Sequence, residues 1–258
     1  MLALSIAGFT KKYGNEIVAV NQLNLDIPTG QIMGLIGPNG AGKTTTINYI
    51  AGLVKPDKGE LSLFGKIITE ASYDHRRYIG IFLEQPIYFE KLTGIEYLHF
   101  CGQMHQLPKE QIISRTDELI ALFDLVDKKD KYIEKYSKGM KKKIALAASI
   151  IHAPLFLALD EPFEGIDPAS VKTVIQYLLL MKQKGKTVLI TSHILSIVEK
   201  LCDEVVIMDK GNIVFKGCLD LMSTETNSAI PSDTNSKLEE IYEHFIDSPQ
   251  KSVTLSWL

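Results

Sequence analysis

The chain has 258 residues, of which 45% are hydrophobic and 23% charged, a composition typical of globular proteins rather than disordered ones. Its net charge of −3 and pI of about 6.1 indicate no basic surface, so we expect no nucleic acid among its partners. The three cysteines, Cys101, Cys202 and Cys218, form no CxxC pair, which argues against a disulfide framework or a zinc site and fits a reducing cytosol.

The first thirty residues predict short antiparallel strands, with Leu2, Leu4 and Ile6 on one face and turns at 13–15 and 28–30. The N-terminal segment lacks a basic region and a cleavage signal, so a strand is a better interpretation than a targeting peptide. A strand at 31–36 and a helix at 43–53 follow, and the helix ends before a proline.

The segment between that strand and that helix matches the phosphate-binding pattern GxxxxGK[ST] in full, as Gly37, Pro38, Asn39, Gly40, Ala41, Gly42, Lys43 and Thr44. Glycines let backbone N–H groups curl around phosphate oxygens, and the helix N-terminus adds partial positive charge. Lys43 can reach the β- and γ-phosphates, Thr44 can ligate Mg²⁺, and Thr45 can hydrogen-bond the α-phosphate. A Gly-rich turn is the alternative, but this context favours an ATP site with Mg²⁺ as cofactor.

The middle of the chain, roughly residues 86–152, contains no convincing strand and reads as a helical insertion. One helical face carries Ile112, Thr116, Leu119, Ile120 and Phe123. The longest apolar stretch, 144–159, is interrupted by polar residues and a proline and is too short to span a membrane. It reads as a helix end, a turn and a buried strand, so any membrane-spanning part must come from another chain.

The second half alternates strands with helices, which predicts an α/β fold with a parallel sheet. Strands are expected at 155–160, 187–191, 205–208 and 213–215, with helices along 171–179 and 194–201. The first of these strands ends in Asp160 and Glu161, at the edge where α/β folds bind ligands. Asp160 can hold Mg²⁺ through water, and Glu161 can polarise an attacking water. A solvated acidic loop is the alternative.

The last forty residues differ in composition. Residues 223–236 are rich in Ser, Thr and Asn and read as a linker. Leu238, Ile241, Tyr242 and Phe245 then fit one short amphipathic helix. We therefore divide the chain into a domain at 1–217, with the insertion inside it, and a tail at 218–258.

The chain resembles the ABC ATPase family over roughly residues 1–217. The resemblance depends above all on Tyr136-Ser137-Lys138-Gly139-Met140, where the common form of the family's signature is LSGGQ. The YSKGM version looks like that of exporters of the ABC-2 group. The resemblance implies a P-loop NTPase (RecA-like) core with an N-terminal antiparallel β subdomain and a helical insertion. It also implies that Ser137 and Gly139 contact the γ-phosphate bound to a second subunit; without the family, this segment is simply a helix cap.

Four further positions of this chain match single functional positions of the family. Tyr13 matches the aromatic that stacks on adenine, although a turn tyrosine is the alternative. Asp167, in 165–168, resembles the loop that crosses the dimer interface, although Asp-Pro also caps helices. His193, in a Thr-Ser-His segment, matches the histidine that contacts the γ-phosphate. Either Glu84 or Gln85 takes the glutamine position that approaches Mg²⁺ or the attacking water, and we assign that role to the pair.

The function implied is an ATP-hydrolysing subunit of a membrane transporter, of the ABC-2 exporter type. Its partners would be separate transmembrane permease subunits and a second ATP-binding subunit, identical or related, on the cytoplasmic face of the membrane. A soluble ABC protein acting on ribosomes or in DNA repair is the alternative, but this chain has one cassette and a short insertion. A P-loop kinase would lack the signature segment, the 165–168 loop and His193.

Overall fold

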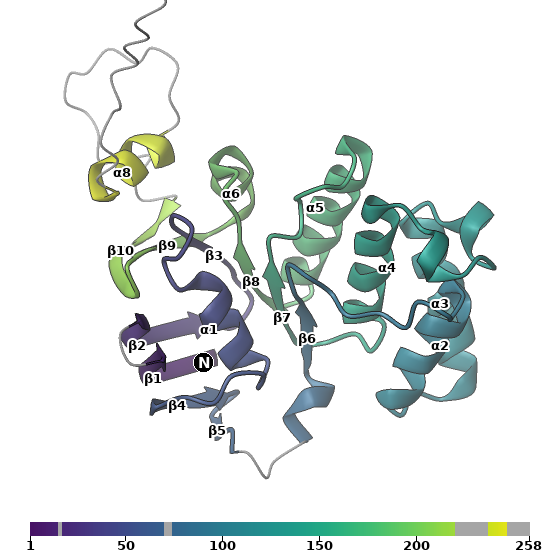
Figure 1. Cartoon of the computed structure of the whole chain (residues 1–258), viewed down its shortest axis with the longest axis horizontal. Helices are drawn as coiled ribbons and strands as arrows, with labels where there is room; N and C mark the ends of the chain where they lie inside the picture. The colour runs from purple at the N-terminus through teal and green to yellow at the C-terminus, as the bar shows by residue number, and fades with distance from the viewer. Residues whose placement is uncertain (15–16, 70–73, 220–236, 247–258) are drawn as a thin grey trace, which may run out of the picture.

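The computed structural model of the chain describes residues 1–14, 17–69, 74–219 and 237–246 (Figure 1). Two sheets form its framework: a six-stranded sheet in the order β10-β9-β3-β8-β7-β6 and a four-stranded sheet in the order β2-β1-β4-β5. The six-stranded sheet comprises β3 (Ile32–Ile36), β6 (Ile79–Phe82), β7 (Phe156–Asp160), β8 (Thr187–Thr191), β9 (Glu204–Asp209) and β10 (Asn212–Cys218). All its pairings are parallel except that between β9 and β10.

The central strands are buried on both faces, as their apolar runs predict. In β7, Leu157 and Leu159 face a cluster formed with the helices of one layer, while Phe156 and Ala158 face the four-stranded sheet. The first layer holds α4 (Lys138–Ile150), α5 (Pro168–Gln183) and α6 (Leu195–Leu201), and α1 (Lys43–Ile50) packs between the two sheets. The predicted α/β class is therefore confirmed.

The four-stranded sheet confirms the antiparallel N-terminal prediction but extends it. Its strands are β1 (Leu2–Tyr13), β2 (Ile17–Pro28), β4 (Lys58–Leu63) and β5 (Lys66–Ile67). The sequence reading did not include β4 and β5. It was also wrong to place Leu2 with Leu4 and Ile6, because a register shift between Leu2 and Leu4 turns Leu2 to solvent while Ala3 is buried. The first predicted turn, 13–15, lies partly outside the described residues.

Three α-helices fill the segment 86–152: α2 (Gly94–Met104), α3 (Lys109–Leu122) and α4. Short 3-10 turns occur at Val126–Lys128 and Ile133–Lys135 here, and at Asp74–Arg77 before β6. The apolar face predicted on α3 is buried, and Thr93 and Glu96 form a capping box at the start of α2. Figure 1 shows these helices beside β6 and β7, at the far edge of the sheet from β10.

The bounds of two other predicted helices can now be stated. The helix predicted to reach residue 53 ends at Ile50, because Gly52 adopts a left-handed conformation (φ 71°) just beyond it. The amphipathic helix of the tail is α8 (Lys237–Phe245), with Leu238 fully buried near α6. The predicted linker, 223–236, lies outside the described residues.

Two sequence-based exclusions can be compared with the structure. Cys101, Cys202 and Cys218 are all free thiols. Among the described helices, none combines the length and the apolar character needed to cross a bilayer.

Candidate active site

The phosphate loop lies between β3 and α1 and requires glycine at two close approaches. Gly37 has φ 152°, and a Cβ there would lie 2.2 Å from the Met208 carbonyl oxygen. Gly42 has φ 106°, and a Cβ there would lie 2.6 Å from the Ala19 carbonyl oxygen. The first helical bond of α1 runs from the Thr46 N–H to the Gly42 carbonyl (2.9 Å), so the N–H groups of residues 43–45 have no intrahelical acceptor. This geometry suits an anion at the start of α1.

Lys43 is the first residue of α1, and its side chain is almost fully buried against this loop. Its ammonium donates to the carbonyl oxygens of Gly37 (2.7 Å) and Pro38 (3.1 Å). Burial lowers the pKa of Lys43, while the carboxylates of Glu161, Asp160 and Glu84 act in the opposite direction. An ammonium has a third N–H, which can be donated to a phosphate oxygen.

Asp160 ends β7 and is fully buried. Parallel pairing places it opposite Thr191 of β8, whose hydroxyl donates to Asp160 Oδ1 (2.6 Å). The second oxygen, Oδ2, is buried with no hydrogen-bond partner among the described residues. A carboxylate oxygen in that position is unfavourable unless water or a cation contacts it.

Carboxylate and hydroxyl oxygens, the donors that Asp160 Oδ2 and Thr44 carry, are hard ligands of the kind that Mg²⁺ prefers. Nowhere in the described residues do three or more His, Cys, Asp or Glu side chains cluster well enough to hold a metal by themselves. The remaining ligands would therefore have to come from nucleotide phosphates and water, as is usual for Mg²⁺.

Glu161 follows directly, in a left-handed conformation (φ 48°) that is rare for any residue except glycine. Its N–H donates to the Thr191 hydroxyl (3.0 Å), so Thr191 contacts both acids. Glu161 Oε2 lies 2.8 Å from His193 Nδ1, which donates when that nitrogen carries the proton, and it accepts from the His193 backbone N–H (3.3 Å). The catalytic candidates Glu161 and His193 therefore form one hydrogen-bonded unit.

Lys43, Glu161 and His193 line a cavity of about 810 Å³, whereas the fully buried Asp160 is not among its lining residues. The predicted site residues that line it are Tyr13, Asn39, Gly40, Ala41, Gly42, Lys43, Thr44, Thr45, Glu84, Glu161 and His193. Glu84 is among them and Gln85 is not, so the geometry favours Glu84 for the role left open between the two.

Sequence reasoning missed several lining or supporting residues. Ile17, Val18 and Ala19, at the start of β2, line the cavity beside Tyr13, and Glu164 lines it as well. Thr191 supports both acids. Its position at the end of a parallel strand, level with Asp160, is the signal that could have identified it.

Ser137, Gly139 and Asp167 do not line this cavity. Ser137 is exposed and caps α4, its hydroxyl accepting from the Met140 N–H (3.2 Å). Asp167 caps α5, accepting from the Ser170 N–H (2.9 Å) and hydroxyl (2.8 Å). Ser137 and Asp167 therefore cap helices, as the alternative interpretations held. If they contact a nucleotide, it would be one bound to another subunit.

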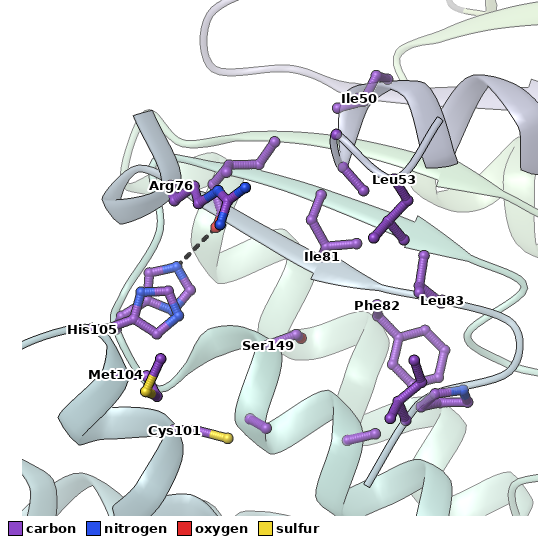
Figure 2. A pocket seen from close by; sticks show the side chains of 18 of the residues that line it. Ile50, Leu53, Arg76, Ile81, Phe82, Leu83, Cys101, Met104, His105 and Ser149 are labelled. Carbon is purple, nitrogen blue, oxygen red and sulfur yellow. Dashed lines mark hydrogen bonds between the residues drawn. The ribbon is translucent and has the colours of Figure 1, made fainter. Parts of the chain in front are cut away.

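A second hollow, a groove of about 490 Å³, is lined by residues from the end of α1, from β6, from α2 and from α4 (Figure 2). Its rim carries exposed Leu53, Ile87 and Met104. Stacked rings of His105 and His152 (centroids 3.6 Å apart) lie at one end, and His152 Nε2 is 3.0 Å from the Ile79 carbonyl oxygen. Burial lowers the pKa of His152 to about 4, so it is neutral at pH 7.

One short loop touches both hollows. Leu83, Pro86 and Ile87 line the groove, while Glu84 lines the nucleotide cavity. Residues 83–87 therefore connect the groove and the 810 Å³ cavity through one short stretch of backbone.

Comparison with known proteins agrees with this geometry. The family model described as "ABC transporter" matches residues 20–164. The daunorubicin resistance ATP-binding protein DrrA3 of Streptomyces coeruleorubidus is 34% identical over 224 residues, covering 87% of this chain and 71% of that protein. The linearmycin resistance ATP-binding protein LnrL of Bacillus subtilis (strain 168) is 34% identical over 240 residues, covering 93% and 77%. A solved structure of an ATP-binding subunit of an ABC transporter superposes with a TM-score of 0.84 at 28% identity, covering 94% of this chain and 99% of that one.

Proposed function

This chain belongs to the ABC transporter family as an ATP-binding, ATP-hydrolysing subunit, and we propose that it works as half of a dimer that powers export through a separate membrane permease. The observation that carries the dimer is the division of the predicted site. Tyr13, the phosphate loop, Glu161 and His193 share one cavity, whereas Ser137 and Gly139 do not line it. A second copy, or a related chain, would complete each site.

In the proposed site, the loop N–H groups and Lys43 bind the phosphates, and Tyr13 stacks on adenine. Glu161 accepts a proton from the water whose oxygen bonds to the γ-phosphorus, while the bond from that phosphorus to the β–γ bridging oxygen breaks and ADP leaves. His193, hydrogen-bonded to Glu161 Oε2, orients that carboxylate and can contact the γ-phosphate.

Thr44, Asp160 Oδ2 and Glu84 are the residues we assign to Mg²⁺, directly or through water. A Mg²⁺ ion held by these residues would supply positive charge to offset the negative charge that develops during phosphoryl transfer. The unpartnered, buried Oδ2 of Asp160 supports this assignment.

The groove between β6, α2 and α4 is the surface we assign to the permease, through a cytoplasmic segment with apolar side chains. Exposed Ile87 (82% exposed) and Met104 (67% exposed) form an apolar rim of the kind that marks an interaction site. The 83–87 loop would then link permease movement to Glu84 and the nucleotide. On this assignment the subunit is peripheral to the cytoplasmic face of the membrane.

Export is the direction we infer, since two relatives, 34% identical each, are named for resistance to daunorubicin and to linearmycin. The YSKGM form of the signature, at residues 136–140, supports the same direction.

The proposal is tested with the full chain, purified alone and from membranes. ATP hydrolysis per molecule should rise with protein concentration, because an isolated subunit binds ATP without a complete site. The chain should also co-purify with a multi-spanning membrane protein. Concentration-independent hydrolysis would overturn the dimer, and a strictly soluble or ribosomal fractionation would overturn the transport role.

A further inference from the structure

Three consecutive lysines near the start of α4 each pair with a different acid. Lys141 Nζ lies 2.7 Å from Glu90, Lys142 Nζ lies 3.5 Å from Glu164, and Lys143 Nζ lies 2.9 Å from Asp167. Successive helical residues point about 100° apart, so three in a row reach three different neighbours. The run follows directly after Ser137-Lys138-Gly139-Met140 and so lies one turn from the signature serine.

Two of these pairs cross between parts of the chain. The helix α4 belongs to the segment 86–152, and Lys141 pairs with Glu90 of that same segment. Glu164 and Asp167 instead follow β7 of the core, a few residues after Glu161. The backbones also approach here, since a Cβ at Gly139 would lie 3.2 Å from the Gly165 carbonyl oxygen.

Lys142 is the least satisfied of the three. Lys142 is only 3% exposed. Its ammonium has no hydrogen-bond partner among the described residues and lies 3.5 Å from the Glu164 carboxylate. A buried ammonium is unfavourable unless it is paired and hydrogen-bonded. Its partner Glu164 is about half-exposed and lines the nucleotide cavity. A shift of that loop by well under ~1 Å would bring the two groups to hydrogen-bonding distance.

We propose that Lys142 and Lys143 are positioning residues that lock the signature end of α4 to the loop following Glu161. Through α4 they set the place of Ser137 and Gly139, which serve the partner's nucleotide. Through Glu164 they act on the loop beside the nucleotide of their own chain. The pairs thereby make occupancy of the two sites of a dimer interdependent, an inference that rests on the proposed dimer.

The test uses the full chain with Lys142→Met, Glu164→Gln and the double variant. We measure nucleotide affinity with a fluorescent ATP analogue, and turnover against ATP concentration for kcat, KM and the Hill coefficient. Lys142→Met should lower kcat about fivefold or more and bring the Hill coefficient to about 1, with nucleotide affinity within about twofold, because pairwise coupling is lost and the phosphate loop is untouched. Adding Glu164→Gln to Lys142→Met should cause little further loss of turnover.

The matched control is Lys141→Met, which removes a neighbouring lysine whose partner lies within the same segment; its kcat and Hill coefficient should stay within about twofold of wild type. If Lys142→Met does not fold, the test uses a charge-swapped double variant, Lys142→Glu with Glu164→Lys. This variant keeps an ion pair at the same place and should show the cooperativity of wild type. Wild-type values in Lys142→Met, an equal loss in Lys141→Met, or a folded charge-swapped variant without cooperativity would each overturn the proposal. A wild-type chain that is neither dimeric nor cooperative would instead refute the proposed dimer.

Discussion

The helices α1 and α4 both begin at a segment assigned to phosphate, but they are held in place by different forces. Around α1 the contacts are backbone contacts: Gly37 and Gly42 lie against the carbonyls of Met208 and Ala19, and the Gly211 N–H donates to the Ala41 carbonyl (3.0 Å). Around α4 they include the side-chain pairs of Lys142 and Lys143. In the proposed dimer, the part of the site that would bind the chain's own nucleotide is thus fixed by close backbone packing, whereas the part that would face a partner's nucleotide is also held by side-chain pairs.

The largest expected effect concerns Glu161, on the phosphate-loop side of the proposed site. Glu161→Gln should lower turnover by ~10²-fold or more, in the range of general acid–base groups, because the base for the attacking water is lost. Binding groups remain, so ATP should hold the variant as a stable dimer, detectable by size-exclusion chromatography. Glu110→Gln, an exposed residue in the first turn of α3, is the control. Undiminished hydrolysis by Glu161→Gln would disprove the catalytic assignment.

Thr191→Val should be the next most damaging change. It keeps the shape of the side chain but removes the hydroxyl that contacts both Asp160 and Glu161. Hydrogen bonds to charged groups contribute about 1.5–3 kcal/mol, so we expect turnover to fall about tenfold or more, with a lower melting temperature. Thr173→Val is the matched control, since among the described residues that hydroxyl donates just to the Ala169 carbonyl of its own helix. Equal activities of the two variants would show that Thr191 does not organise the site.

A third prediction concerns the groove lined by β6, α2 and α4, which we assign to the permease. Ile87→Asp should weaken co-purification with the permease about tenfold or more, since burying such a side chain contributes about 1.5–3 kcal/mol. Hydrolysis by the chain alone should change by less than about twofold, because Ile87 does not line the nucleotide cavity. Val126→Asp, an exposed apolar position away from the groove, is the control. Unchanged co-purification would remove the groove as the docking surface.

The smallest expected effect concerns pH. Hydrogen bonds from Ser170, together with Lys143, hold the pKa of Asp167 well below its ordinary value. A depressed folded-state pKa means that the pair stabilises the fold above the unfolded value of about 3.9 and that this contribution is lost as the pH falls further. Urea unfolding of wild type and Asp167→Asn should therefore differ by a constant amount from pH 5 to 8 and converge below about pH 4. A difference that vanishes near neutral pH would contradict the pairing.

Much of the fold could be predicted because its strands are buried on both faces. The runs at β3, β7 and β8 are almost purely apolar, and the phosphate loop requires glycines at fixed positions. β4 could not be predicted so readily, since three of its six residues are exposed and its apolar positions are only Leu61 and Leu63. The prediction that Leu2 shares a face with Leu4 and Ile6 was wrong because a bulge between Leu2 and Leu4 breaks the strand's alternation.

In the candidate site, too, some residues could be predicted from the sequence and others could not. Residues within one continuous motif, such as Lys43 and Thr44, could be assigned from spacing alone. Thr191 could not, because its role depends on which strand lies beside β7, and sequence does not state strand order. The pairs of Lys142 and Lys143 also depend on how the insertion packs against the core, a relation between segments about twenty residues apart with a full strand between them.

Glu161 has one more consequence, which concerns evolution. A non-glycine residue in the left-handed region stores roughly 1–3 kcal/mol of backbone strain. Glycine would therefore suit the backbone better at this position, and a population selected only for heat resistance would tend to lose the proposed catalytic base. The glutamate's persistence would then measure selection for turnover acting against selection for stability.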